Sequence, residues 1–284
     1  MSSSHLLSRA TEDSISAGKR NIAIAEVVIF SLIQIVQVSL RYMQEWRYWH
    51  HRKRKSPVRC VLYSWFSMVG LLSQIRIASS AMILSTSTPN ESILTAELSM
   101  QSVGLSPLLF EVSLVLLRCG EAGEFGPGNS KYTKAMRVLL HGFRFPIAVA
   151  IVLAVVGGII KMHALEVAGS IVFIVTFVFV CGLIAWLAVK SRTTLTLAGH
   201  HGILLILCAL PFLLVRVIYF LLLEYGPVKF NPGYGDVGIL AGMGLLMEVF
   251  VVSLLVTART VAEPIFGPAD IKHVVSHDEE RTGN

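Results

Sequence analysis

Charged residues are scarce in this chain of 284 residues, where Asp, Glu, Lys and Arg together make up 15%. Soluble domains carry about 25% charged residues. Hydrophobic residues reach 54%, and the mean hydropathy is +0.68. The shortage of charge excludes a disordered chain, a fibrous repeat and an ordinary cytosolic enzyme. Four cysteines are too few for the framework of a disulfide-rich secreted module. A polytopic membrane protein is the class that remains.

The motifs of several membrane enzymes and receptors are missing as well. Residues 237–258 contain no lysine for a retinal Schiff base, and Arg118 lacks the acidic neighbour that a G-protein-coupled receptor would have. The chain has no glycine-rich phosphate loop, no serine elbow and no aspartate-rich pair for magnesium. The histidines show no convergent ligand pattern. We therefore expect no metal and no cofactor, and any carbocation chemistry would begin with a proton.

Seven apolar stretches are long enough to cross a bilayer, which takes about 20 residues as a helix. Each ends at polar or turn-forming residues. They are 22–43, 60–84, 93–117, 136–160, 164–189, 200–224 and 237–258. The sequence predicts an all-α polytopic membrane protein with a seven-transmembrane-helix bundle. It divides into a polar amino-terminal tail (1–21), the transmembrane domain (22–258) and a cytoplasmic tail (259–284).

Lys and Arg predict the orientation of this bundle. With the amino terminus outside, most of them fall on the inner side, including the run from Arg52 to Lys55. The positive-inside rule then predicts an outside or lumenal amino terminus and a cytoplasmic carboxyl terminus. Trp49 beside the basic run is typical of an anionic membrane surface, and no nucleic-acid fold accompanies it. We expect a multi-pass protein of the endoplasmic reticulum, with the glycosylation sequon at Asn90 facing the lumen.

Four ionisable residues fall inside the predicted spans, where a charge is costly and marks a functional candidate. Arg76 and Arg216 lie about 12 Å below the outer ends of their helices. Glu97 enters from the outer end of the third span, and Glu248 lies near the middle of the seventh. At similar depths these charges can neutralise one another. They either surround a polar pocket or act only as ion pairs that fix helix register.

Helical spacing places polar side chains on single faces of three spans. The stripes carry Glu97, Gln101 and Glu111 on the third span, Glu26, Gln34, Gln37 and Arg41 on the first, and Glu248 on the seventh. Three stripes are more than interhelical contacts usually need, so we expect a shared interior pocket that opens towards the lumenal leaflet. In the inner half, Glu111 and Arg144 are expected to form a structural bridge between the third and fourth spans.

Short motifs in four spans carry a family resemblance. They are Gly104–Leu109 in the third span, Pro211–Tyr219 in the sixth, Met247–Glu248 in the seventh and Arg76 in the second. With these motifs the chain resembles fungal seven-helix integral membrane proteins of largely unassigned function, over about residues 20–260. The resemblance extends to fungal lipid-exporter-like proteins. It also extends to the transmembrane terpene cyclases of fungal meroterpenoid pathways, of the macrophorin and ascofuranone type.

The resemblance implies a metal-independent terpene cyclase that protonates a prenylated meroterpenoid intermediate, with or without an epoxide. Such a reaction needs a proton donor in a dry apolar cavity and aromatic faces that stabilise the cation. The catalytic candidates are the buried carboxyl groups of Glu248 and Glu97. The substrate-binding candidates are Arg76, Arg216, Tyr219, Gln101 and Phe212. The partners would be the lipid bilayer, a lipid-soluble isoprenoid-type substrate and pathway enzymes in the same membrane.

A transporter or lipid sensor is the alternative that the sequence leaves open. Its arginines would recognise an acidic head group without any chemistry. Pro107, Pro146 and Pro211, which we expect to kink their helices, would permit movement. A purely structural scaffold ranks third, because it accounts least well for the buried charges.

Overall fold

Every regular element in the described part of the chain is a helix. The computed structural model describes residues 17–51, 57–85, 100, 104–121, 131–160, 162–227, 230 and 236–263. Six helical segments within these ranges are at least 18 residues long and apolar enough to span a membrane. The fold is therefore all-helical, and the chain is a multi-pass membrane protein.

The helices follow the predicted apolar stretches in order along the chain. They are α2 (Ala17–His51), α3 (Pro57–Trp65), α4 (Met68–Ser85), α6 (Leu105–Glu121), α7 (Lys134–Gly142), α8 (Arg144–Ile160), α9 (His163–Thr194), α10 (Leu197–Tyr225), α11 (Val237–Ile239), the π-helix η2 (Leu240–Leu246) and α12 (Met247–Ala262). Thr133 and Thr196 are the N-cap residues of α7 and α10. Their side-chain oxygens accept hydrogen bonds from backbone N–H groups in the first turn of each helix, as is usual for N-cap residues.

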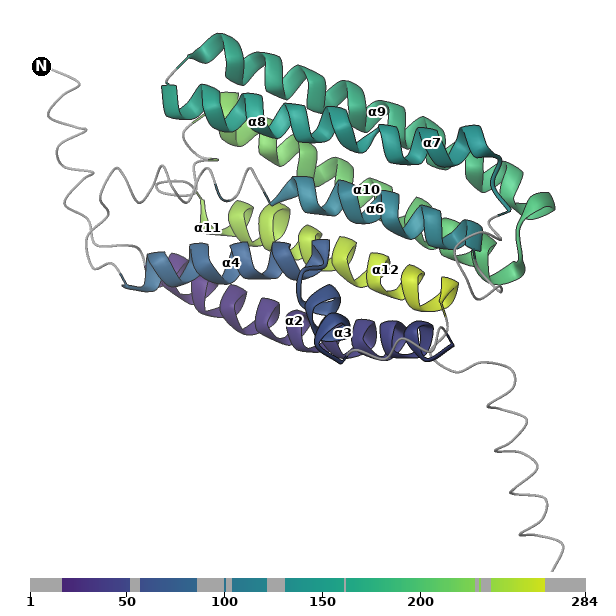
Figure 1. The fold of residues 1–284 in the computed structure, drawn as a ribbon. Coiled ribbons are helices and arrows are strands. Elements are labelled where there is room, and N and C mark those ends of the chain that lie inside the picture. The colour runs from purple at the N-terminus through teal and green to yellow at the C-terminus, as the bar shows by residue number, and fades with distance from the viewer. Residues whose placement is uncertain are drawn as a thin grey trace, which may run out of the picture.

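Helices α6, α10 and α12 form the centre of the bundle. In Figure 1, α8 and α9 cover them at the top of the view, and α2 and α4 lie below. The interface of the three central helices is filled by buried aliphatic side chains such as Leu108, Val112, Leu213 and Val252. Residues from α4, α10 and α12 can therefore meet in the interior although they are far apart in the sequence.

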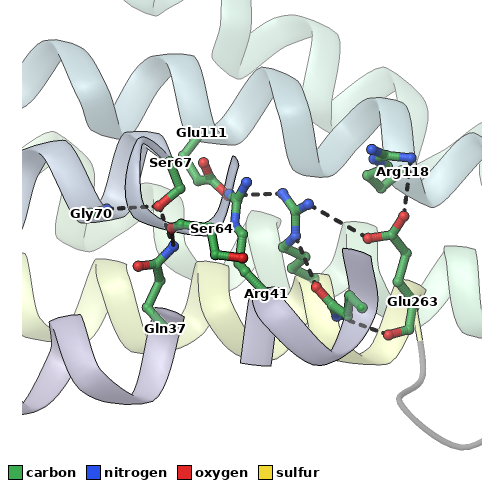
Figure 2. Close-up of polar contacts among 10 residues, drawn as sticks. Gln37, Arg41, Ser64, Ser67, Gly70, Glu111, Arg118 and Glu263 are labelled. Atoms are coloured by element: carbon green, nitrogen blue, oxygen red, sulfur yellow. Dashed lines mark hydrogen bonds and ion pairs between the residues drawn. The ribbon is translucent and has the colours of Figure 1, made fainter. Parts of the chain in front are cut away.

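The second predicted stretch (60–84) is broken into α3 and α4 around Ser67. The Ser67 hydroxyl accepts a hydrogen bond from the Gly70 backbone at 3.0 Å. Gln37 of α2 donates to the Ser64 carbonyl at 3.2 Å and also to the Ser67 hydroxyl (Figure 2). These contacts satisfy backbone groups that the break leaves without helical partners.

The fourth stretch (136–160) is also broken, at Phe143 between α7 and α8. Pro146 has no N–H to donate to the carbonyl of Gly142, so an unbroken helix would lack a hydrogen bond there. Pro211, by contrast, lies inside α10, which runs unbroken over 29 residues. Pro107 occupies the first turn of α6, where a missing N–H costs little. The three prolines that were expected to kink their helices therefore have different positions: Pro146 follows a helix break, Pro211 lies inside an unbroken helix, and Pro107 lies in a first turn.

The third predicted stretch (93–117) is the one that is not counted among the six spans. The helix described there, α6, begins at Leu105 and has 17 residues. Residues 86–99 and 101–103 lie outside the described ranges. The described residues therefore contain six candidate membrane-spanning helices.

The last stretch contains a feature that hydropathy does not reveal. Residues Leu240–Leu246 form a π-helix, which passes directly into α12 just before Glu248. Segments of π-helix are rare and often occur at functional sites. At its other end, α12 continues to Ala262, beyond the predicted end at residue 258. Arg259, which the sequence placed in the cytoplasmic tail, is therefore part of this helix and is buried.

Candidate functional site

The centre of the bundle holds a cluster of charged side chains around Glu248, which we name the Glu248 cluster: Arg76, Arg216, Glu248 and Glu26. Arg76 of α4 donates from Nε to Glu248 Oε1 at 2.7 Å and from Nη2 to Glu248 Oε2. Glu248 lies on α12 and is 1% exposed, and both arginines are 2% exposed. The Arg76–Glu248 pair is thus bidentate and fully buried, which is the strongest geometry for such a pair.

Arg216 of α10 approaches the same carboxylate from another side. Its Nη2 lies 3.0 Å from Glu248 Oε2. With the described residues, however, neither Nε nor Nη2 of Arg216 forms an aligned hydrogen bond. The guanidinium carbon lies 5.3 Å from the ring centre of Tyr219, one turn further along α10, which is a cation–π distance. Arg76 and Arg216 therefore share the Glu248 carboxylate, and the Nε of Arg216 has no hydrogen-bond acceptor among the described residues.

Glu26 of α2 is the member of the cluster that sequence reasoning did not select as a site residue. It is 6% exposed, and it interacts electrostatically with both Arg76 and Arg216. The Ser80 hydroxyl donates to its Oε2 at 2.5 Å. The sequence placed Glu26 on the polar face of the first span, which was the available signal for a site residue. Its partner Ser80 on α4 could not be predicted from the sequence.

The predicted site residues are only partly brought together. Arg76, Arg216, Glu248 and Tyr219 meet as described above. Phe212 lies one turn before Arg216, and its ring contacts Phe250 at 5.2 Å between centroids. Glu97 and Gln101 lie outside the described residues.

The pairing of Glu248 bears on the role that the sequence gave it. Both of its oxygens accept hydrogen bonds from a guanidinium. Protonation would break both ion pairs inside an apolar interior, where an unpaired charge is costly. Glu248 therefore holds two cations in place, and its role as a proton donor stays a prediction.

A second cluster, centred on Glu111 of α6, lies further along the bundle (Figure 2). We name it the Glu111 cluster: Arg41, Glu111 and Arg259. Arg41 of α2 donates to Glu111 Oε1 at 2.5 Å, and Arg259 of α12 donates to the same oxygen at 3.3 Å. All three residues are buried. Again two arginines share one carboxylate, and here the sharing joins α2, α6 and α12.

The Glu111 cluster continues towards the end of the bundle as a chain of alternating charges. Arg259 lies 3.6 Å from Glu263, Glu263 lies 3.1 Å from Arg118, and Arg118 lies 3.3 Å from Glu121. Gln44 of α2 accepts from Arg259 at 3.3 Å and donates to the Glu263 carbonyl at 3.0 Å. The outer members of this chain are about one quarter to one third exposed, so their individual ion pairs contribute little stability.

The expected bridge between Glu111 and Arg144 is replaced by these contacts. Arg144 donates from Nε to the Ser113 hydroxyl at 2.9 Å, and the Glu111 carboxylate is bound by Arg41 and Arg259 instead. Arg41 lies within the predicted first span and on its polar face, but its partner was not predicted. Arg259 lies beyond the predicted end of the last span, and the extension of α12 to Ala262 brings it to Glu111.

One helix connects the two clusters. Glu248 and Arg259 both lie on α12, eleven residues apart, which corresponds to about 16 Å along the helix axis. Between them α12 contributes buried apolar residues, including Val251, Val252 and Leu255. On α12 an apolar stretch therefore separates the two charged clusters, whereas α2 places the buried Gln34 and Gln37 between them. Among the described residues, no three His, Cys, Asp or Glu side chains converge in a way that would hold a metal ion.

Comparisons with known proteins bear on the family but not on the activity. No curated protein and no solved structure matches the chain. Nothing in these comparisons links it to the terpene cyclases that the short motifs suggested. One family, described as "Domain of unknown function (DUF7702)", matches residues 17–262, a range that includes both charged clusters. The chain belongs to this DUF7702 family.

Proposed function

We propose that the protein is a membrane carrier for an amphipathic molecule with an acidic head group, which the Glu248 cluster binds. The observation that carries this proposal is that Arg216 is buried and yet keeps its Nε without a hydrogen-bond partner among the described residues. Glu248 and Glu26 balance the charge of the two arginines, but Arg216 has only an ion pair with Glu248, through Nη2 at 3.0 Å. A buried donor without an acceptor is costly, and an anionic ligand would supply the acceptor.

The hydrogen bonds suggest a different role for each arginine. Arg76 is fixed by its two contacts to Glu248. Arg216 keeps Nε without a hydrogen-bond partner among the described residues, and its Nη2 forms only a non-aligned ion pair with Glu248 at 3.0 Å. A guanidinium offers its donors in a planar fork that matches carboxylate and phosphate oxygens. Arg216 is therefore the residue that we propose binds the head group, with Arg76 and Glu248 holding it in position.

The Glu111 cluster supplies the second element that a carrier needs. Transport requires a barrier on each side of the binding site, and each barrier must open in turn. The Glu111 cluster ties α2, α6 and α12 together about 16 Å from Glu248 along α12. Ion pairs of this kind can separate and re-form as helices move. We propose that this cluster forms the barrier on the side where α12 ends.

The proposal includes seven membrane crossings, with α6 as the third, and an outside or lumenal amino terminus. Seven crossings place the two termini on opposite sides, whereas six would place them together. The carboxyl-terminal ends of α6 and α9 carry Arg118, Lys190 and Arg192, and α7 begins with Lys134. The alternation of helix direction brings these residues to one end of the bundle, which supports a cytoplasmic location for it. We propose the endoplasmic reticulum as the membrane.

Arg216→Met tests the carrier proposal. We expect the variant to fold, because Arg76 and Glu248 keep their bidentate pair and methionine fills an apolar site well. We expect it to lose transport, because the head group loses its donors. The measurement uses phosphatidylcholine vesicles that contain the purified protein and an NBD-labelled alkyl phosphate. Reduction of the fluorophore by external dithionite reports how fast the probe reaches the outer leaflet.

Two controls make this result specific. An NBD-labelled alkyl phosphocholine has the same chain but no net charge, and we expect the wild type to move the phosphate at least ten-fold faster. Arg192→Met removes an exposed arginine of α9 and should leave transport unchanged. Equal rates for both probes, or a normal rate in Arg216→Met, would contradict the carrier proposal.

A terpene cyclase is the second candidate, and the position of Glu26 favours it. Glu26 is buried, and its hydrogen-bond partner among the described residues is the neutral Ser80 hydroxyl. Of the two carboxyl groups in the Glu248 cluster, Glu26 is the one whose protonation gives up no ion pair with a described residue. The ring of Tyr219, which lies 5.3 Å from Arg216 of the same cluster, can stabilise a cation. In this reaction the Glu26 carboxyl would be the proton donor in place of Glu248.

Glu26→Gln tests the cyclase candidate. Microsomes that hold the protein are incubated with an epoxyfarnesyl phenol, and the product sought is an isomer of equal mass. If the protein is a cyclase, we expect the wild type to form this isomer and Glu26→Gln to lose about 100-fold or more of the rate, as expected for removal of a general acid. Glu263→Gln, a partly exposed carboxyl outside the cluster, serves as the matched control. Unchanged substrate with the wild type would exclude the cyclase for this substrate class.

A further inference from the structure

An apolar groove of about 610 Å³ runs between α7, the start of α8, and α9. This volume lies in the range of about 300–1,000 Å³ that is typical of small-molecule sites. The lining residues are Val138, Leu139, Gly142, Phe143, Pro146, Ile171, Val172, Val175, Thr176 and Phe179. The one hydroxyl among them, on Thr176, donates to the Val172 carbonyl at 2.7 Å. The groove therefore offers no free polar group and suits a hydrocarbon chain.

The groove lies where α7 meets α8 at Phe143 and faces α9, along which α8 packs (Figure 1). Gly142 forms one part of its wall, and a Cβ added there would meet no atom within 4 Å. The lack of a side chain at this position contributes to the open space.

One end of the groove carries positive charge. On α9, the groove residues Val175 and Phe179 are followed on the same helix face by Trp186 and Lys190, by the spacing of an α-helix. The Lys190 ammonium lies 4.8 Å from the ring centre of Trp186. On α7, Lys134 stands one turn before Val138. Since α7 and α9 run in opposite directions, both lysines lie at the same end of the groove.

We infer that this groove binds one acyl chain of an anionic phospholipid, whose head group lies between Lys134 and Lys190. Tryptophan and lysine together mark the level of the head groups at a membrane surface. A hydrocarbon chain with a negative head matches an apolar groove that ends in two ammonium groups. The site is separate from the Glu248 cluster, and it does not depend on the proposed transport.

The experiment uses the full chain in nanodiscs of equal parts phosphatidylcholine and phosphatidylserine. Native mass spectrometry counts the lipids that stay bound after the disc is removed. We expect phosphatidylserine to be enriched about five-fold or more, because each lysine near the surface contributes about 1 kcal/mol of attraction. The Lys134→Gln/Lys190→Gln double variant should retain both lipids equally. Gly142→Leu should fill the groove and reduce retention of both.

Arg192→Gln is the matched control. It removes one positive charge from the same helix at nearly the same depth, but on the opposite face from Lys190, and it should keep the wild-type preference. All these side chains are exposed, so the variants should fold normally, which size-exclusion chromatography verifies. Equal retention of the two lipids by the wild type would overturn the inference. A loss of preference in Arg192→Gln as large as in the double variant would do the same, because it would reveal a non-specific charge effect.

Discussion

Glu248→Gln is expected to lower the free energy of unfolding by about 3–5 kcal/mol, the usual cost of removing one partner from a buried ion pair. The substitution keeps the shape of the side chain but leaves the guanidiniums of Arg76 and Arg216 without their shared anion. Glu26 is close enough to compensate part of this charge, so the loss should fall near the lower end of the range. Thermal unfolding of the purified protein in detergent would show a midpoint lower by about 10 °C.

A double variant separates this electrostatic effect from a loss of packing. Glu248→Gln/Arg216→Met removes one cation together with the anion and leaves Arg76 facing Glu26. Because the residues are in direct contact, their effects should not add. We expect the double variant to regain about half of the lost stability, by the same cost of an unpaired buried charge. A double variant as unstable as the sum of the single variants would show that the charges do not act together.

Glu111→Gln is expected to have a similarly large effect in the other charged cluster. It leaves Arg41 and Arg259, both buried, without their common partner, and the expected cost is again about 3–5 kcal/mol. Because Glu111 joins α2 to α6 and α12, the loss should also loosen α2. Hydrogen exchange of the α2 backbone, followed by mass spectrometry, should therefore accelerate more than that of α9.

Glu263→Gln is the matched control for this prediction. Glu263 belongs to the same chain of charges, but its side chain is 28% exposed, and exposed ion pairs contribute about 0–1 kcal/mol. We expect a shift of the unfolding midpoint of at most a few degrees. Equal losses of stability in Glu111→Gln and Glu263→Gln would show that burial does not determine the strength of these ion pairs.

The membrane-spanning helices could be predicted because hydropathy reports how long an apolar stretch is. It does not report how the helix behaves inside that stretch. The breaks at Ser67 and Phe143 and the π-helix from Leu240 to Leu246 all fall within apolar sequence, so they leave no trace in a hydropathy profile. Pro146 was a usable signal, but the sequence suggested a kink where the structure has a change of helix.

The Glu248 cluster could be anticipated because Arg76, Arg216 and Glu248 each interrupt an apolar run. The choice of partners could not, because it depends on which helices are neighbours. Arg41 and Arg259 are separated by more than 200 positions in the chain, and both stand near the ends of apolar stretches. Only the structure shows that the side chains of Arg41 on α2 and Arg259 on α12 meet at Glu111 on α6.

The π-helix before Glu248 has a consequence for how the bundle can change shape. A π-helix holds more residues in each turn than an α-helix does. Converting the segment to an α-helix would therefore shift the residues before it by up to one position relative to α12, which is about 100° of rotation. In this winding, Gly244 faces Tyr219, and a Cβ added to Gly244 would meet the ring at 3.6 Å. Rewinding the segment as an α-helix would turn residues 236–246 about their own axis and separate Gly244 from Tyr219. Glu248 and the rest of α12 would stay in place. Access to the buried arginines from that side can thus depend on local coiling rather than on tilting of whole helices.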